Sequence, residues 1–295
     1  MKLVVGYLAT PGGADALALG VRLARSLGAQ LEICLILPPG KLPALGGAPA
    51  SYDQLVAEQA DEWLSEAVAQ VPPGLVAHGH RLFSESFAQG LIDEVGRLEA
   101  DVLVVGGAGG GLAGSFSLGS VVNELLYSSP VPVAVAPRGI RESRVDSVRE
   151  VTCAVGERAG ADLLLQTAVR FCAVAGTPLR LASLVTLDPV FGSLRGDSDA
   201  IREYALNHAR LTLESAKNEL PEGFPVSATV ADAASIEEAV SRLEWHDGDL
   251  IMVGSSRLSA PRRLFLGSTA AKMLRVLDVP MIVVPRDQLS EEDLP

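Results

Sequence analysis

The sequence predicts two α/β domains of the same doubly wound type, one after the other in a chain of 295 residues. Three observations support this fold class. Glycines and prolines of the first half recur 148 residues later, a spacing as long as a whole domain. Short apolar runs alternate with segments of helical periodicity, which is typical of a parallel sheet covered by helices. The length also agrees with two domains of roughly 150 residues each.

The repeat is clearest where an aspartate precedes an apolar run that ends in glycine. Asp101 begins this run in the first half and Asp249 begins it in the second. Other residue pairs keep the same separation: Gly28 and Gly176, Gly106 and Gly254, Gly119 and Gly267, Pro132 and Pro280, and Pro137 and Pro285. A constant offset over so many positions indicates duplication of a complete domain.

The elements of the first half follow from its apolar pattern. Continuous apolar runs such as Val-Leu-Val-Val predict strands that are buried on both faces, and apolar residues at helical spacing predict the helices between them. The expected order is strand 3–8, helix 13–27, strand 31–37, helix 52–71, strand 75–83, helix 86–98, strand 102–106, helix 120–127 and strand 131–136. The second half is expected to repeat this order from residue 151 to residue 284.

The domain boundaries follow from a change in composition. Arg138, Arg141 and Arg144 stand among glutamates and serines, so residues 139–148 are predicted to be a linker between domains at 1–138 and 149–286. Residues 287–295 are expected to form an acidic, frayed tail.

The charge is acidic and evenly divided. Residues 1–147 carry 9 Lys and Arg against 15 Asp and Glu, and residues 148–295 carry 15 against 21, so each half has a net charge of −6. This balance argues against a nucleic-acid or anionic-membrane surface, because both need a basic face. No apolar run reaches the ~20 residues of a membrane span. The three cysteines lie in apolar runs without metal or redox spacing, so a cytoplasmic protein with reduced cysteines is expected.

The most specific candidate site is the loop after the strand at 102–106. Its pattern, Gly106-x2-Gly109-x9-Gly119-Ser120, runs from the end of a strand to the start of a helix. Glycines let a backbone approach a phosphate, and a helix N-terminus supplies free amides and the positive end of its dipole. The alternative interpretation is that these glycines only permit a tight turn and close packing of helix on sheet.

This spacing and the Val-Pro-Val strand that follows it resemble the universal stress protein family in its tandem two-domain form. The resemblance covers both halves. Members that bind ATP carry Gly-x2-Gly-x9-Gly followed by Ser or Thr, and the equivalent residues of the second half are Gly254, Arg257, Gly267 and Ser268. The resemblance implies five parallel strands in each half and ATP as the cofactor, with or without magnesium. It also implies association through the last strands, 131–136 and 279–284, between chains or between the tandem domains.

The chain departs from this family pattern at three places. Leu8 stands where ATP-binding members keep an aspartate at the end of the first strand. Arg257 replaces the second glycine of the motif, and it either fills the phosphate space or redirects the loop, while Arg262 and Arg263 offer guanidinium groups to a phosphate. Residues 106–120 contain no Lys or Arg. We therefore expect the first half to be the better nucleotide site.

Three other motifs give weaker indications of function. Residues 11–16 (Pro-Gly-Gly-Ala-Asp-Ala) are similar to the pyrophosphate loop of ATP pyrophosphatase ligases, but both serines of that loop are missing. The dinucleotide-like pattern of Gly109, Gly111 and Gly114 follows the fourth strand, and the next strand ends without an acid for a ribose. His78 and His80 share one face of a strand, but a zinc site needs further ligands, so a surface pair is expected.

The sequence thus predicts a stress-response protein that binds adenine nucleotide at its glycine loop. The alternative is an interaction module of the same fold that binds no nucleotide and associates through its last strands. A nucleotide-dependent ligase-type enzyme is the third hypothesis. No nucleophile and base can be paired from the sequence, so no catalytic residue and no metal ligand is predicted.

Overall fold

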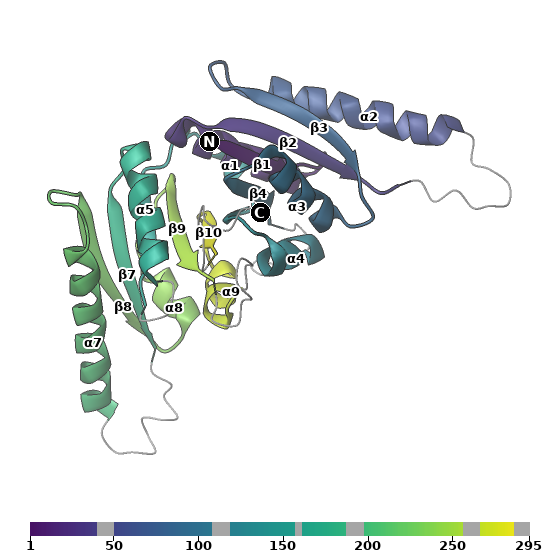
Figure 1. Cartoon of the computed structure of the whole chain (residues 1–295). Coiled ribbons are helices and arrows are strands. Elements are labelled where there is room, and N and C mark those ends of the chain that lie inside the picture. Colours follow the sequence, from purple (N-terminus) through teal and green to yellow (C-terminus); the bar gives the residue numbers. More distant parts are fainter. Residues whose placement is uncertain (40–49, 108–118, 157–160, 187–197, 256–265, 286–295) are drawn as a thin grey trace, which may run out of the picture.

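The computed structural model describes residues 1–39, 50–107, 119–156, 161–186, 198–255 and 266–285. In this part of the chain the strands form one ten-stranded sheet, in the order β3-β2-β1-β4-β5-β10-β9-β6-β7-β8 (Figure 1). From the centre outward, each half has the same strand order, and helices flank the sheet. The predicted α/β class, with two doubly wound repeats, is confirmed.

The first half alternates strands and helices as expected. Its elements are β1 (Lys2–Gly6), α1 (Pro11–Leu27), β2 (Gln30–Leu37), α2 (Ala50–Ala69), β3 (Ala77–Phe83), α3 (Phe87–Leu98), β4 (Val102–Gly106), α4 (Ser120–Ser128) and β5 (Val133–Ala136).

Several boundaries differ from the expectation by one or two residues, and two of these differences have a clear local reason. Helix α1 begins at Pro11 because the side chain of Thr10 caps it by accepting from the amide of Gly13, and proline suits the first helical turn. Strand β3 begins two residues later than expected, at Ala77. The amide of Leu75 donates to the carbonyl of Pro72, and Gly74 has a φ of 96°, so these residues form a turn.

The second half repeats the order. Its elements are β6 (Glu150–Ala154), α5 (Ala161–Ala175), β7 (Leu179–Thr186), α7 (Ser198–Asn218), β8 (Val226–Ala233), α8 (Ile236–Ser241), β9 (Asp249–Gly254), α9 (Ser268–Leu274) and β10 (Met281–Val284). Figure 1 shows α2 lying along β3 and α7 along β8, at the two outer ends of the sheet.

The helices bury the two faces of the sheet separately. In β1, Leu3 and Val5 pack into a core with α1 and α2, whereas Val4 packs into a core with α3 and α4. The first core continues through α5 and α7 of the second half, and the second continues through α9. Alternate residues of a strand point to opposite faces, so continuous apolar runs fill both cores.

The two halves join through their last strands. All the strand pairs of the sheet are parallel except β5 and β10, which pair antiparallel with Ala134 opposite Ile282. These two residues are 148 positions apart, so the pairing is centred on equivalent positions of the repeat. Both sides of each strand are occupied within one chain. Because the pair is antiparallel, the two sets of parallel strands run in opposite directions. Their carboxyl ends therefore lie on opposite sides of the sheet, at opposite ends of the strands.

The segment between the halves packs against α1. It contains a 3₁₀ turn, η1 (Ile140–Glu142), whose surroundings include the buried carboxylate of Asp15. Asp15 accepts hydrogen bonds from the amides of Gly139 and Arg141 at 3.1 and 3.2 Å, and the Arg141 guanidinium contacts both its oxygens at 2.9 and 3.0 Å. Asp15 is therefore used to hold the connecting segment.

Arg22 of α1 makes a second set of contacts to this segment. It is 4% exposed. Its guanidinium donates to the carbonyl of Val145 at 3.0 Å, to the hydroxyl of Ser143 at 2.5 Å and to Asp247 at 3.3 Å. Asp247 belongs to the second half, so one side chain of α1 ties the first half to both the connection and the second half.

We expect Asp15→Asn to destabilise the protein. Loss of the charge weakens its hydrogen bonds to two amides and to Arg141, which should lower the free energy of unfolding by about 1.5–3 kcal/mol. Urea unfolding measures the change. Glu142→Gln is the matched control, because Glu142 is an exposed partner of the same arginine at 3.4 Å and should change stability by less than about 0.5 kcal/mol. Equal small effects in both variants would contradict the role assigned to Asp15.

Candidate functional site

Each half has a pocket at the carboxyl ends of its first and fourth strands, where open α/β sheets place ligands. The first-half pocket has a volume of about 620 Å³. It lies between the end of β1, the start of α1, the end of β4 and the start of α4. Its lining residues are Gly6, Leu8, Thr10, Pro11, Gly12, Gly13, Asp15, Phe87, Val105, Gly106, Gly107, Gly119, Ser120, Val121, Val122 and Arg138.

Packing within the chain accounts for two of the glycines around this pocket. A Cβ atom on Gly106 would lie 1.9 Å from the carbonyl oxygen of Gly12, and one on Gly13 would lie 1.8 Å from the carbonyl oxygen of Leu8. Neither space admits a side chain, so the start of α1 rests directly on the end of β4. Close packing, the alternative interpretation of the glycine motif, therefore explains Gly106.

The polar groups of the first-half pocket lie at the start of α4 and after β5. Ser120 is the first residue of α4, and its N-cap, Gly119, gives no side-chain hydrogen bond to the first-turn amides. Free amides at a helix start attract anions. Arg138 adds an exposed guanidinium to the same pocket. The structure thus brings together a helix N-terminus and a positive charge.

Sequence reasoning missed Arg138, because it looked for cations only within residues 106–120. The signal was available: Arg138 follows the last strand by two residues. That strand lies beside β4, and the amide of Gly107 donates to the carbonyl of Ala136 at 3.0 Å. Neighbouring parallel strands end at the same edge, so the residue after Pro137 had to lie near the glycine loop.

The predicted site residues divide into three groups. Gly106, Gly119, Ser120 and Leu8 all line the first-half pocket, and Gly254 and Gly267 line the second. Ser268, although it begins α9, is not among the residues that line the second pocket. The last group, Gly109, Arg257, Arg262 and Arg263, lies outside the described residues.

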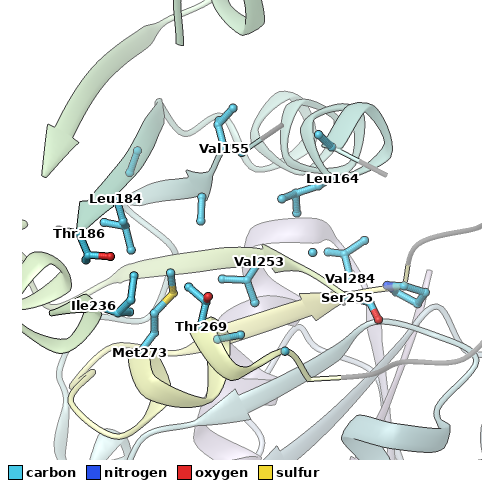
Figure 2. A pocket seen from close by; sticks show the side chains of 18 residues that line it. Val155, Leu164, Leu184, Thr186, Ile236, Val253, Ser255, Thr269, Met273 and Val284 are labelled. Atoms are coloured by element: carbon cyan, nitrogen blue, oxygen red, sulfur yellow. The ribbon is translucent and has the colours of Figure 1, made fainter. Parts of the chain in front are cut away.

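The second-half pocket has a volume of about 330 Å³, and its lining combines aliphatic side chains with the hydroxyls of Thr186, Ser255 and Thr269 (Figure 2). Its walls come from β6, α5, β7, α8, β9, α9 and the end of β10. The lining residues are Ala154, Val155, Gly156, Ala161, Leu164, Ala182, Leu184, Thr186, Ile236, Val253, Gly254, Ser255, Gly267, Thr269, Ala270, Met273, Val284 and Pro285. None of these described lining residues is charged.

Small side chains open this second space. In the first half, Leu91 fills the equivalent region, since its Cδ1 lies 2.8 Å from where a Cβ on Gly6 would be. The residue equivalent to Leu91 in the repeat is Ala239, which packs with Ala182 in a small cluster. A Cβ atom on Gly254 would meet Leu164 at an ordinary 3.7 Å. Residues 157–160, which correspond in the repeat to the segment that contacts Gly106, lie outside the described residues.

The two strand histidines form a polar cluster around a buried carboxylate. Glu32 of β2 is 3% exposed and lies 2.6 Å from Nε2 of His80 and 3.2 Å from Nδ1 of His78. Burial raises the pKa of Glu32, but the hydrogen bonds and charges of the two histidines outweigh it and hold the pKa below its ordinary value. Among the described residues, no group of three or more His, Cys, Asp or Glu is arranged to hold a metal ion.

The cysteines have no nucleophilic character. Cys34, Cys153 and Cys172 are buried and free. Burial raises the pKa of the Cys153 thiol to about 12 and that of Cys172 to about 11, and it raises that of Cys34 as well. Thiols, not thiolates, are therefore present at neutral pH, and only thiolates attack.

In the helices that the structure describes, no segment is long and apolar enough to cross a membrane.

Comparisons with known proteins agree with the repeat. The model of the universal stress protein family matches residues 1–137 and 147–285. Universal stress proteins of Mycobacterium tuberculosis and Mycobacterium bovis are each 30% identical over 294 residues, covering 97% of this chain and 100% of the relative.

Solved structures share the fold over nearly the whole chain. A universal stress protein from Archaeoglobus fulgidus matches with a TM-score of 0.69 at 18% identity, covering 97% of this chain and 98% of the other. A protein of unknown function from Pseudomonas aeruginosa matches with a TM-score of 0.59 at 15% identity, covering 96% and 92%.

We expect Glu32→Gln to lower the free energy of unfolding by about 1.5–3 kcal/mol at pH 7, because it weakens hydrogen bonds to a charged group. The folded-state pKa of Glu32 is below its ordinary value of 4.5. Its stabilisation is therefore present above pH 4.5 and is lost as the pH falls through the lower, folded-state pKa.

Urea unfolding of both proteins between pH 3 and pH 7 measures this difference. Glu62→Gln, which changes an exposed glutamate of α2, is the control and should have little effect at any pH. A wild-type advantage over Glu32→Gln that stays constant down to pH 3 would contradict the lowered pKa.

Proposed function

This chain belongs to the universal stress protein family in its tandem two-domain form, and we propose that it serves the stress response by binding an adenine nucleotide in the first-half pocket. The observation that carries the proposal is the joint presence in that pocket of Arg138 and the start of α4. A nucleotide needs both a site for its phosphates and an apolar surface for its base, and this pocket offers the two together.

The phosphates would meet the amides at the start of α4, the hydroxyl of Ser120 and the guanidinium of Arg138. Guanidinium groups match phosphate oxygens in shape and charge. A magnesium ion bound with ATP would share the charge of the phosphates. Val105, Val121 and Val122 line the pocket beside this polar end and would contact the base or ribose. The volume of about 620 Å³ lies within the range of small-molecule sites, about 300–1,000 Å³.

We propose a binding protein rather than an enzyme. The carboxylate among the described residues of the first-half pocket is that of Asp15, and both its oxygens already accept hydrogen bonds from the connecting segment. A general base must be within reach of the proton that it removes. Asp15 is already hydrogen-bonded to the connecting segment and is not free to act as a general base. Any ATP turnover would therefore be slow and incidental.

The alternative is an interaction module that binds no nucleotide. Two observations favour it: the packing of Gly12 on Gly106 accounts for one motif glycine, and Leu8 brings no carboxylate to the pocket. Protein purified without added nucleotide separates the hypotheses. Nucleotide carried by the chain appears as excess absorbance at 260 nm and is identified by mass spectrometry. A chain that carries none and binds none in a titration would support the interaction module.

We expect Arg138→Gln to weaken ATP binding. Loss of a hydrogen bond between charged partners costs about 1.5–3 kcal/mol, which is roughly 10- to 150-fold in affinity. Calorimetric titration with ATP and magnesium measures it. Arg144→Gln is the matched control, because it removes the same charge from an exposed arginine outside the pocket. Equal losses in both variants would show a general charge effect, and no loss in Arg138→Gln would place the nucleotide elsewhere.

A further inference from the structure

We infer that Asp15 is a positioning residue for the nucleotide site: it fixes the backbone beside Arg138, so that the guanidinium of Arg138 is directed at the phosphates. The inference rests on the proposed function of the first-half pocket. Asp15 and Arg138 both line this pocket. They come from different elements, because Asp15 belongs to α1 whereas Arg138 follows β5.

The backbone around Arg138 is held at two places. Before it, the carbonyl of Ala136 accepts a hydrogen bond from the amide of Gly107 at 3.0 Å, which ties the end of β5 to the end of β4. After it, the carboxylate of Asp15 accepts from the amide of Gly139 at 3.1 Å. The side chain of Arg138 is itself exposed. A long exposed side chain loses rotamer freedom when it binds a ligand, so an anchored backbone lowers the cost of placing the guanidinium.

The charge of Asp15 is balanced within the chain. Asp15 is 2% exposed, and the Arg141 guanidinium contacts both its oxygens at 2.9 and 3.0 Å. The two opposite charges largely cancel at a distance, so this carboxylate can line the pocket with little repulsion of a phosphate. Residues 108–118, which lie outside the described residues, include no charged residue.

Gly139 gives the segment its direction. Its φ is 85°, in the region that favours glycine. No described atom lies within 4 Å of where its Cβ would be, so this position depends on backbone conformation and not on a tight space. The next residue, Ile140, is buried in the core that α1 covers. The turn at Gly139 and the amide hydrogen bonds to Asp15 therefore decide how residues 137–141 pass the pocket.

The test is a calorimetric titration of the full chain with ATP and magnesium and, separately, with adenosine, which has no phosphate. Removal of a carboxylate from the pocket wall favours an anion, so a purely electrostatic role of Asp15 predicts tighter ATP binding in Asp15→Asn. Positioning predicts the opposite sign. We expect ATP to bind Asp15→Asn at least about twofold more weakly, the lower end of the coupling within one hydrogen-bond network. Adenosine binding should be unchanged.

A double variant separates positioning from a loss of stability. In Arg138→Gln the guanidinium to be positioned is absent, so the addition of Asp15→Asn should weaken ATP no further. A general loosening of the fold would instead weaken ATP and adenosine in both backgrounds. Glu142→Gln is the matched control, because Glu142 is an exposed carboxylate that contacts the same Arg141, and it should leave both affinities unchanged.

A second single variant, Gly139→Ala, keeps every charge. Its methyl group meets no described atom but disfavours the positive φ of this residue. Gly139→Ala should therefore weaken ATP and leave adenosine unchanged. It decides the question where Asp15→Asn fails to fold.

The outcomes separate this inference from the proposed function. Wild-type protein that binds no ATP, or an ATP affinity that Arg138→Gln leaves unchanged, overturns the proposed function and the inference with it. ATP binding that Arg138→Gln weakens but Asp15→Asn leaves unchanged or tightens overturns the inference alone. The inference is also overturned where Asp15→Asn weakens ATP as much in the Arg138→Gln background as in the wild type.

Discussion

The antiparallel pairing of β5 with β10 is the interaction on which the rest of the structure depends. It joins two sheets of five strands into one, with Ala134 opposite Ile282 at equivalent positions of the repeat. An apolar edge strand left open would recruit other chains, and here each half covers the edge of the other. The same pairing makes the two sets of strands run in opposite directions, so that their carboxyl ends lie on opposite sides of the sheet. The pockets of the two halves are thereby kept apart.

The connection between the halves follows from this geometry. The chain leaves β5 and begins β6 on the far side of β10 and β9, and it crosses the face of the sheet beside α1. Asp15 and Arg22 of α1 bind the crossing segment, and Arg22 also reaches Asp247 of the second half. Their buried charges stabilise the fold because each has several partners, whereas an unpaired charge there would destabilise it.

The fold could be predicted from the sequence largely because duplication made each pattern appear twice. Apolar runs and glycine positions located the strands, and the boundaries that shifted were decided by single contacts, such as the cap from Thr10 to Gly13. The candidate site was harder to predict from the sequence. The contribution of Arg138 depends on strand order, and the partners of Asp15 are more than 120 residues away. The replacement of Leu91 by Ala239 at the equivalent position of the second half is also recorded by no motif.

The two halves therefore share a backbone fold and differ in the side chains at and beside their pockets. In the first, Leu91 packs against the end of β1 where the repeat has Ala239 in the second, and Arg138 lies at the first-half pocket. The most direct test is a crystal structure of the chain grown with ATP and magnesium. We expect nucleotide density in the first-half pocket, with phosphates between the start of α4 and Arg138. Nucleotide in the second-half pocket alone, or in neither pocket, would contradict this expectation.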